Sequence, residues 1–189
     1  MAVKAWLMDD GEEDQRLPHH RIPVEYVLLN QLAEIGILYW HLDPKDYENN
    51  EQLKEVRENR GYNYMDLLEL CLGKVENYEE KLNNFFREHI HVDEEIRFCL
   101  EGSGYFDASN MIILLVGIYH RFTLDTSNYV KYKGEVLRKM TTFSFRQLMR
   151  LFIGEPMWTA YNQPQEDHLA RQVYIKSFLE KPRIALKAV

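Results

Sequence analysis

The stretch from Glu88 to Asp107, EHIHVDEEIRFCLEGSGYFD, decides the fold class. Apolar and polar residues alternate in its middle, with Ile96, Phe98 and Leu100 on one side and Glu95, Arg97 and Cys99 on the other. A period of two residues is typical of a β-strand with one buried face. The Gly-Ser-Gly that follows predicts a turn. We therefore expect a strand, a turn and a second strand here.

The rest of the chain divides into a helical front and a β-rich second half. Apolar spacing and glycine stops predict helices over 24–36, 50–60 and 64–72, and a strand over 37–43. Asn77 with Glu80 has the form of a capping box that opens a further helix. The second half predicts a strand over 111–125, a strand and turn over 149–161, and a C-terminal helix that ends before Pro182. The pattern indicates an α+β protein, mainly β: a small β barrel or sandwich braced by helices in the N-terminal half and at the C-terminus.

Composition bounds the class of protein. The chain has 189 residues, 46% of them hydrophobic, and a formal net charge of −7. We expect one domain over 1–189: a front over 1–88, the barrel over 89–161 and a helix over 162–189. The sequence contains no stripe of Lys and Arg residues, so a nucleic-acid partner is not expected. The acidic N-terminus is unlike a signal peptide, and the run 111–119 is too short to span a bilayer, so a cytoplasmic protein with reduced cysteines is expected.

Two histidines and a glutamate form the candidate metal motif. Residues two apart in a strand lie on one face, so a strand that is continuous or bends gently would bring His89, His91, Glu95 and Arg97 together. Two imidazoles and one carboxylate are the ligand set preferred by iron(II), with nickel, cobalt or manganese as alternatives. The other interpretation is a chance row of solvated polar residues.

His120 follows the longest apolar run and adds a third imidazole if its strand lies beside the first. Four protein ligands leave two positions of an octahedral ion open, which suits a bidentate substrate with adjacent oxygens. The remaining histidines are best explained as surface or core residues: His19, His20, His41 and His168.

The motif HxHxxxE, followed by Gly102 and a later Gly-x-x-His, resembles the two metal-binding motifs of the cupin superfamily. Five blocks in order narrow the match: AWLMDD, GILYWHLD, NYEEKLNNFFREHIHVDEEIRFCLEGSGYFD, GIYHRFTLD and MRLFIGEPMWTAYNQP. Together they closely resemble the acireductone dioxygenase family of methionine salvage. The resemblance implies a cupin-type β barrel that binds one iron(II), or nickel(II) as the alternative metal, through His89, His91, Glu95 and His120.

The resemblance also implies the reaction. The substrate is the acireductone 1,2-dihydroxy-3-keto-5-methylthiopentene, which reacts with O2. The iron form gives formate and 4-methylthio-2-oxobutanoate, and the nickel form gives methylthiopropionate, formate and CO. Arg97 matches an arginine that stabilises the enediolate oxygen, and Arg150 matches a further basic position. Three aromatic residues match pocket positions, with core packing as the equal alternative: Phe85, Phe122 and Trp158.

The chain departs from the family pattern in two places. After Asp107 it is shorter by about two strands, and Leu115 stands where the family has proline. Residues 132–148, YKGEVLRKMTTFSFRQL, are an insertion with β-forming residues but no evident partner strand. A catalytically impaired cupin that acts as a binding or regulatory protein therefore stays open as an alternative, as does another cupin enzyme such as an isomerase. We expect a monomer in the cytoplasm, with the nucleus as a further compartment.

Overall fold

The structure is a computed structural model, and it describes residues 3–9, 11, 13–14, 16–87, 89–92, 95–109, 119–125, 128–132, 138–157, 159–162, 164–165 and 167–176. For residues 95 and 174, and for the described residues from 109 to 146, only the backbone is described.

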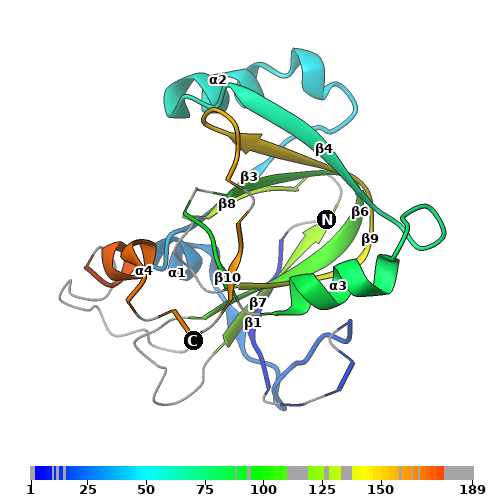
Figure 1. The fold of residues 1–189 in the computed structure, drawn as a ribbon, viewed down its shortest axis with the longest axis vertical. Coiled ribbons are helices and arrows are strands. Elements are labelled where there is room, and N and C mark those ends of the chain that lie inside the picture. Colours follow the sequence, from blue (N-terminus) through cyan, green and yellow to red (C-terminus); the bar gives the residue numbers. More distant parts are fainter. Residues whose placement is uncertain are drawn as a thin grey trace.

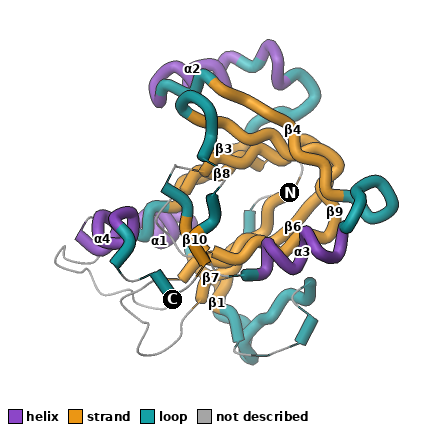
Figure 2. Tube along the Cα trace, viewed as in Figure 1, coloured by secondary structure: helices purple, strands orange, loops and turns teal. Residues whose placement is uncertain are grey.

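One antiparallel sheet contains all the strands of the described residues (Figure 1, Figure 2). Its strands are β1 (Ala5–Leu7), β2 (Tyr26–Val27), β3 (Ile37–His41), β4 (Tyr64–Leu70), β5 (His89–Ile90), β6 (Glu95–Ser109), β7 (Tyr119–Asp125), β8 (Asn128–Tyr132), β9 (Arg138–Phe152) and β10 (Tyr161–Asn162). The order is β10-β5-β9-β6-β7-β1-β2, while β4 pairs with β9 and β8 pairs with β3 and β6.

The centre of the sheet is the pair β6 and β9. These strands run antiparallel from Ile96 opposite Leu151 to Ala108 opposite Arg138. Along its other edge β6 pairs with β8 in its first part and with β7 in its second. The second part of the inserted segment 132–148 therefore lies in β9, so the expectation that this segment has no partner strand is wrong.

β6 continues through the Gly-Ser-Gly, where a turn was predicted. The register with β9 shifts three times between Cys99 and Gly104, and Gly102 has φ 113°. Shifts of this kind are β-bulges, which bend a strand and increase its twist, and a glycine tolerates the positive φ. The glycines thus bend one long strand and do not join two short ones.

The chain length shows how strongly the sheet is curved. His89 of β5 lies opposite Arg138 of β9, and Arg138 lies opposite Ala108 of β6. Ala108 and Glu95 lie near opposite ends of β6. Each step between strands is about 5 Å, and the six residues from His89 to Glu95 span at most ~21 Å. Glu95 and Ala108 are therefore at most about 31 Å apart, whereas a straight strand of thirteen residues would span ~43 Å. The strand must therefore be curved.

The sheet has two faces, each with a buried cluster. The face that we call inner carries Val3, Ala5, Leu32, Ile35, Ile37, Leu70, Cys99, Phe106, Ala108 and Leu148. The outer face carries Leu42, Leu53, Tyr62, Ile96, Phe98, Leu100, Met149 and Leu151. Alternate residues of β6 and β9 belong to opposite clusters, as the period of two predicted. Cys71 and Cys99 are both buried thiols.

The helices match the predictions unevenly. α2 (Glu51–Arg60) begins after Asn50, whose side chain accepts a hydrogen bond from the backbone NH of Leu53, and ends at Gly61 in the left-handed conformation. α3 (Tyr78–Phe86) forms as predicted, but Asn77 is left-handed and makes no side-chain cap, so the capping box is wrong. Besides η1 (Tyr47–Asn49), the other helices are short: α1 (Leu29–Glu34) and α4 (Leu169–Tyr174).

Two predicted helices are corrected. Residues 24–36 contain strand β2 and the six-residue α1, because the segment pairs with β1 before it turns. The predicted helix over 64–72 is strand β4, whose residues alternate between the two faces. An apolar run this short does not distinguish a helix from a strand until its partner is known.

The chain is a mixed α/β protein with more strand than helix, as expected. Closure of the sheet into a barrel, bracing of that barrel by the helices and the single domain over 1–189 stay predictions. Among the described residues, no helix has the length and apolar character needed to cross a membrane. Figure 1 shows α2 above the sheet and α3 beside the lower part of β9.

Candidate metal and substrate site

His89 and His91 lie next to one another, but not on one continuous strand. β5 ends at Ile90, and β6 begins only at Glu95, so the expected unbroken strand from 89 to 97 is wrong. The two imidazole rings nevertheless have centroids 4.9 Å apart at an interplanar angle of 83°. His89 is buried, with 7% of its surface exposed, and His91 is half-buried. The structure thus brings together two of the four predicted ligands.

Backbone carbonyls orient both imidazoles. His89 Nδ1 lies 2.6 Å from the carbonyl oxygen of Arg87, and His91 Nδ1 lies 3.1 Å from that of Thr159. A carbonyl oxygen only accepts, so each Nδ1 carries the hydrogen, and the neutral form of each ring has its lone pair on Nε2. This is the tautomer in which a histidine binds a metal through Nε2 while a second contact fixes the ring. The pair fits a divalent metal.

The strand that carries His89 is held from the C-terminal side of the chain. β10 pairs with β5, so that Tyr161 lies opposite Ile90. Ile90 is fully buried and packs in a small cluster with Ala170 of α4 and with Tyr161. The rings of Tyr161 and His168 also lie in contact, with centroids 4.2 Å apart at a tilted angle of 44°. The side chain of His168 accepts a hydrogen bond from the backbone NH of Ala170 at the start of α4. These contacts anchor the histidine pair.

Glu95 and His120 are described by their backbones alone. Glu95 begins β6, opposite Tyr132, and His120 lies in β7, between Leu7 and Ala108. His120 and His89 therefore lie in one cross-strand row through β7, β6, β9 and β5. The distance between the two positions is about 14 Å measured along the sheet, and the straight-line distance is shorter because the sheet is curved. Among the side chains that the structure does describe, no group of three or more His, Cys, Asp or Glu could hold a metal. The four-ligand set stays a prediction.

Arg97 lies two positions beyond Glu95 in β6. It is buried, with 6% of its surface exposed, and its Nη1 donates to the carbonyl of Ile96 at 3.3 Å. Its neighbours Ile96 and Phe98 belong to the outer cluster, so the side chain of Arg97 belongs to the inner face, as does that of Cys99. A buried guanidinium on the same strand as the predicted ligand Glu95 can stabilise negative charge that develops on a substrate oxygen.

Arg150 lies directly opposite Arg97, and Asp66 lies directly opposite Arg150. The guanidinium donates twice to the carboxylate, from Nε to Oδ1 at 2.7 Å and from Nη2 to Oδ2 at 2.6 Å. Sequence reasoning named both arginines but missed Asp66, because residues 64–72 were expected to be helical. The signal that could have found it is the period of two along β4, which puts Asp66 on the same face as Leu68 and Leu70.

The structure describes two of the three predicted aromatic positions. Phe85 of α3 is half-buried and packs against the inner cluster. The backbone of Phe122 lies in β7 between Ala5 and Phe106, two members of that cluster. Trp158 lies outside the described residues. Phe85 thus borders the inner face, and the contact of these side chains with a substrate stays a prediction.

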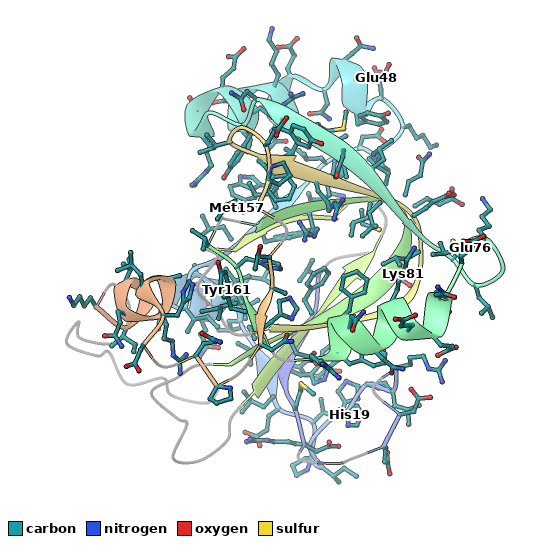
Figure 3. The ribbon with its side chains drawn as sticks, viewed as in Figure 1. His19, Glu48, Glu76, Lys81, Met157 and Tyr161 are labelled. Atoms are coloured by element: carbon teal, nitrogen blue, oxygen red, sulfur yellow. The ribbon has the colours of Figure 1, made fainter. Side chains whose placement is uncertain are left out.

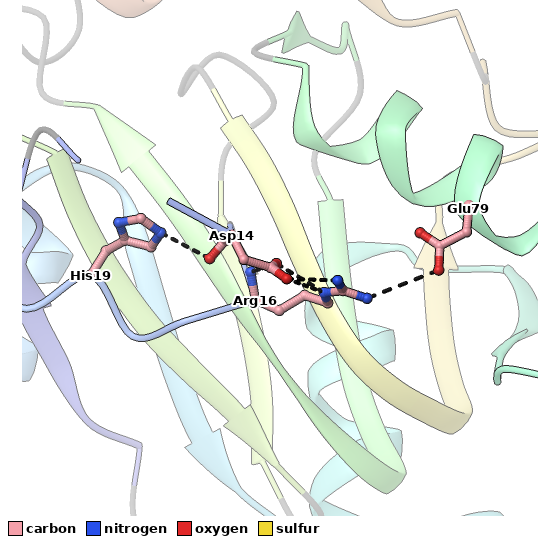
Figure 4. Close-up of polar contacts among 4 residues, drawn as sticks. All are labelled: Asp14, Arg16, His19 and Glu79. Carbon is pink, nitrogen blue, oxygen red and sulfur yellow. Dashed lines mark hydrogen bonds and ion pairs between the residues drawn. The ribbon is translucent and has the colours of Figure 1, made fainter. Parts of the chain in front are cut away.

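A separate polar network lies near the N-terminus (Figure 4). Arg16 donates to both carboxylate oxygens of Asp14, at 2.9 and 2.6 Å, and lies 3.9 Å from Glu79. The hydrogen bonds from Arg16 lower the pKa of Asp14 from its usual 3.8 to about 2. The buried ring of His19 lies between Asp9 Oδ1 and the carbonyl of Asp14. Figure 3 shows His19 well apart from Tyr161, the residue that lies opposite Ile90 of β5.

Comparisons with known proteins agree with the motif. The model of the ARD/ARD' family matches residues 4–110, more than half of the chain. Acireductone dioxygenase 1 of Vitis vinifera is 57% identical over 203 aligned positions, and acireductone dioxygenase 4 of Arabidopsis thaliana is 54% identical over 202; both alignments cover all of this chain and all of the relative. The chain therefore belongs to the ARD/ARD' family, the acireductone dioxygenase family that its motifs resembled.

A solved structure shows the same fold at lower identity. It is the acireductone dioxygenase from Bacillus anthracis with cadmium ion in its active center, with a TM-score of 0.61 and 21% identity. The match covers 85% of this chain and 99% of that one. The alignment with the Vitis relative is longer than the 189 residues of this chain, so it contains gaps on this side, in line with the predicted deletion.

Proposed function

We propose that the protein is a metal-dependent dioxygenase of methionine salvage that cleaves the acireductone 1,2-dihydroxy-3-keto-5-methylthiopentene with O2. The observation that carries the proposal is the pair His89 and His91, whose Nδ1 hydrogens point at backbone carbonyls so that both Nε2 atoms are in the metal-binding form. The names of relatives that match the whole chain at 54–57% identity support it.

The residues that would hold the metal are His89, His91, Glu95 and His120. A bound iron(II) supplies a centre at which adjacent substrate oxygens and O2 are brought together. We propose one iron(II) per chain, with formate and 4-methylthio-2-oxobutanoate as products. With nickel(II) as the alternative metal, the products are methylthiopropionate, formate and CO.

The remaining site residues act on the substrate. Arg97 is a buried donor that stabilises the negative oxygen of the ionised substrate, because a fixed guanidinium in a site with little water interacts strongly with a developing charge. Arg150 supplies a second guanidinium on the same face. Phe85, Phe122 and Trp158 form the apolar wall for the methylthio end of the substrate.

The test is metal content followed by turnover. The purified protein is stripped of metal, reloaded anaerobically with iron(II), and assayed for metal per chain and for acireductone loss on addition of O2. We expect about one metal per chain, from the single four-ligand set, and substrate loss well above the rate without protein. Products are identified with iron and with nickel separately. Metal binding without such loss would contradict the proposal.

The second candidate is a binding or regulatory protein that has kept the fold. One observation favours it: the family match ends at residue 110, before the predicted third histidine. The same assay separates the two, because this candidate predicts substrate loss at the rate without protein. We further propose a monomer in the cytoplasm, also present in the nucleus, with no nucleic-acid partner in view of its net charge of −7.

A further inference from the structure

We propose that Asp66 is a positioning residue that fixes Arg150 beside Arg97, so that the two arginines together bind the anionic oxygens of an ionised ene-diol substrate. This inference rests on the proposed function, but it adds a residue of β4, outside the candidate motif, and assigns it a task. Asp66 acts through Arg150 and need not contact the substrate.

The register of three strands builds the arrangement. Asp66 of β4, Arg150 of β9 and Arg97 of β6 are direct cross-strand neighbours in one row. The adjacent inner row is apolar and consists of Leu68, Leu148 and Cys99. The charged row therefore continues the inner face of the sheet, where Phe85 also packs, and it begins two residues from Glu95, a predicted ligand.

The contact between Asp66 and Arg150 is well suited to fix a side chain. Both terminal oxygens of the carboxylate accept, at 2.7 and 2.6 Å, so the guanidinium plane is set as well as its position. The side chains of Arg150 and Asp66 are 16% and 25% exposed. A two-point contact with this little exposure is screened less than a surface ion pair and restricts the long arginine side chain.

Charge explains why such a contact is needed. Two arginines directly opposite each other on neighbouring strands repel, which would drive one of them away from the face. The carboxylate on the third strand offsets one of the two charges and holds Arg150 in place. Asp66, Arg150 and Arg97 together then carry a net charge of one positive unit, at the end of the row where β6 carries the predicted ligand Glu95. A net positive charge there attracts an anionic substrate oxygen.

The positioning role of Asp66 predicts that its loss changes KM more than kcat. A fixed Arg150 interacts with the ionised substrate before and during the reaction alike, so loss of its orientation weakens binding of both states. Weakening of this uniform kind raises KM and leaves kcat almost unchanged. It leaves the metal site intact, because Asp66 is not a proposed ligand.

The experiment compares D66N, R150Q and the double variant D66N/R150Q with the wild type, all loaded with iron(II). The matched control is D14N, which removes the same kind of two-point contact, between Asp14 and Arg16, in the N-terminal network. Metal content and far-UV circular dichroism are measured first. We expect D66N to raise the KM for acireductone about tenfold, the loss of one charge-assisted contact, with kcat within about twofold and D14N unchanged.

The double variant separates positioning from a general structural effect. If Asp66 acts only through Arg150, D66N/R150Q has the KM of R150Q, whereas independent effects multiply. Multiplied effects, a KM of D66N equal to that of D14N, or a fall in kcat at unchanged KM would each overturn the inference.

Three results decide what is overturned. If D66N does not fold, D66E replaces it: the carboxylate is kept but displaced by one methylene, and an unchanged KM in this folded variant overturns the inference. A wild type without turnover overturns the proposed function, and the inference with it. An active wild type whose D66N variant matches D14N overturns the inference alone.

Discussion

His91 Nδ1 donates a hydrogen bond to the carbonyl oxygen of Thr159, 68 residues further along the chain, at 3.1 Å. The contact joins the histidine pair to the segment between β9 and β10. It fixes one tautomer of His91, the tautomer that offers Nε2 to a metal. The orientation of a predicted ligand thus depends on a backbone atom, which no sequence motif contains.

Replacing His91 by alanine tests the ligand role directly. We expect His91→Ala to lose metal binding and turnover together, because the remaining groups form an incomplete set for the ion. Metal per chain is measured by elemental analysis of the dialysed protein. The control is His41→Ala, which removes an exposed imidazole at the end of β3. Full metal content in His91→Ala would contradict the assignment.

Arg97 is expected to act on the reaction and not on the metal. Arg97→Gln should lower kcat about 100-fold, the usual effect of losing one donor to a developing negative oxygen, while metal content stays that of the wild type. Steady-state rates and elemental analysis on the same samples check this. Arg16→Gln, which removes an exposed guanidinium in the N-terminal network, is the control. Equal kcat values for the two variants would refute the role of Arg97.

Leu148 tests whether the inserted segment belongs to the core. It is fully buried in β9, between Leu68 and Cys99 on the inner face. Leu148→Ala should therefore reduce the free energy of unfolding by about 2–5 kcal/mol, as large-to-small changes in a core do. Urea unfolding measures it, with the exposed neighbour Gln147→Ala as control. If both variants unfold at the wild-type midpoint, β9 does not pack as described.

Asp14 predicts a small effect of pH on stability. Its pKa is lowered to about 2 in the folded protein by the hydrogen bonds from Arg16, against an ordinary 3.8. A lowered pKa stabilises the fold above pH 3.8, and this contribution disappears as the pH falls from about 3.8 to 2. Because the pair is exposed and screened, we expect less than about 1 kcal/mol.

The measurement compares urea unfolding of Asp14→Asn with the wild type at pH 7 and at pH 3. The difference should be larger at pH 7, and 1 M salt should reduce it. Glu155→Gln, which removes another exposed carboxylate, serves as the control. A difference that grows toward pH 3 would contradict the sign.

Local sequence predicted those elements that are decided locally. α2 (Glu51–Arg60) forms close to the predicted 50–60, because its caps, Asn50 and the left-handed Gly61, directly flank the helix. β4 was expected to be a helix, since a short apolar run is compatible with both structures. Only its pairing with β9 makes it a strand, and Asp66 was missed for the same reason.

The sequence by itself determined the chemical types of the candidate site: the imidazole pair, the glutamate, the arginine two residues beyond it and the family to which they belong. The tertiary structure alone decided that His91 faces the carbonyl of Thr159 and that Asp66 holds Arg150, 84 residues away, beside Arg97. The physical reason is that strand register follows from hydrogen bonds and burial between segments far apart in the chain. Those pairings are not encoded in the preferences of any short stretch.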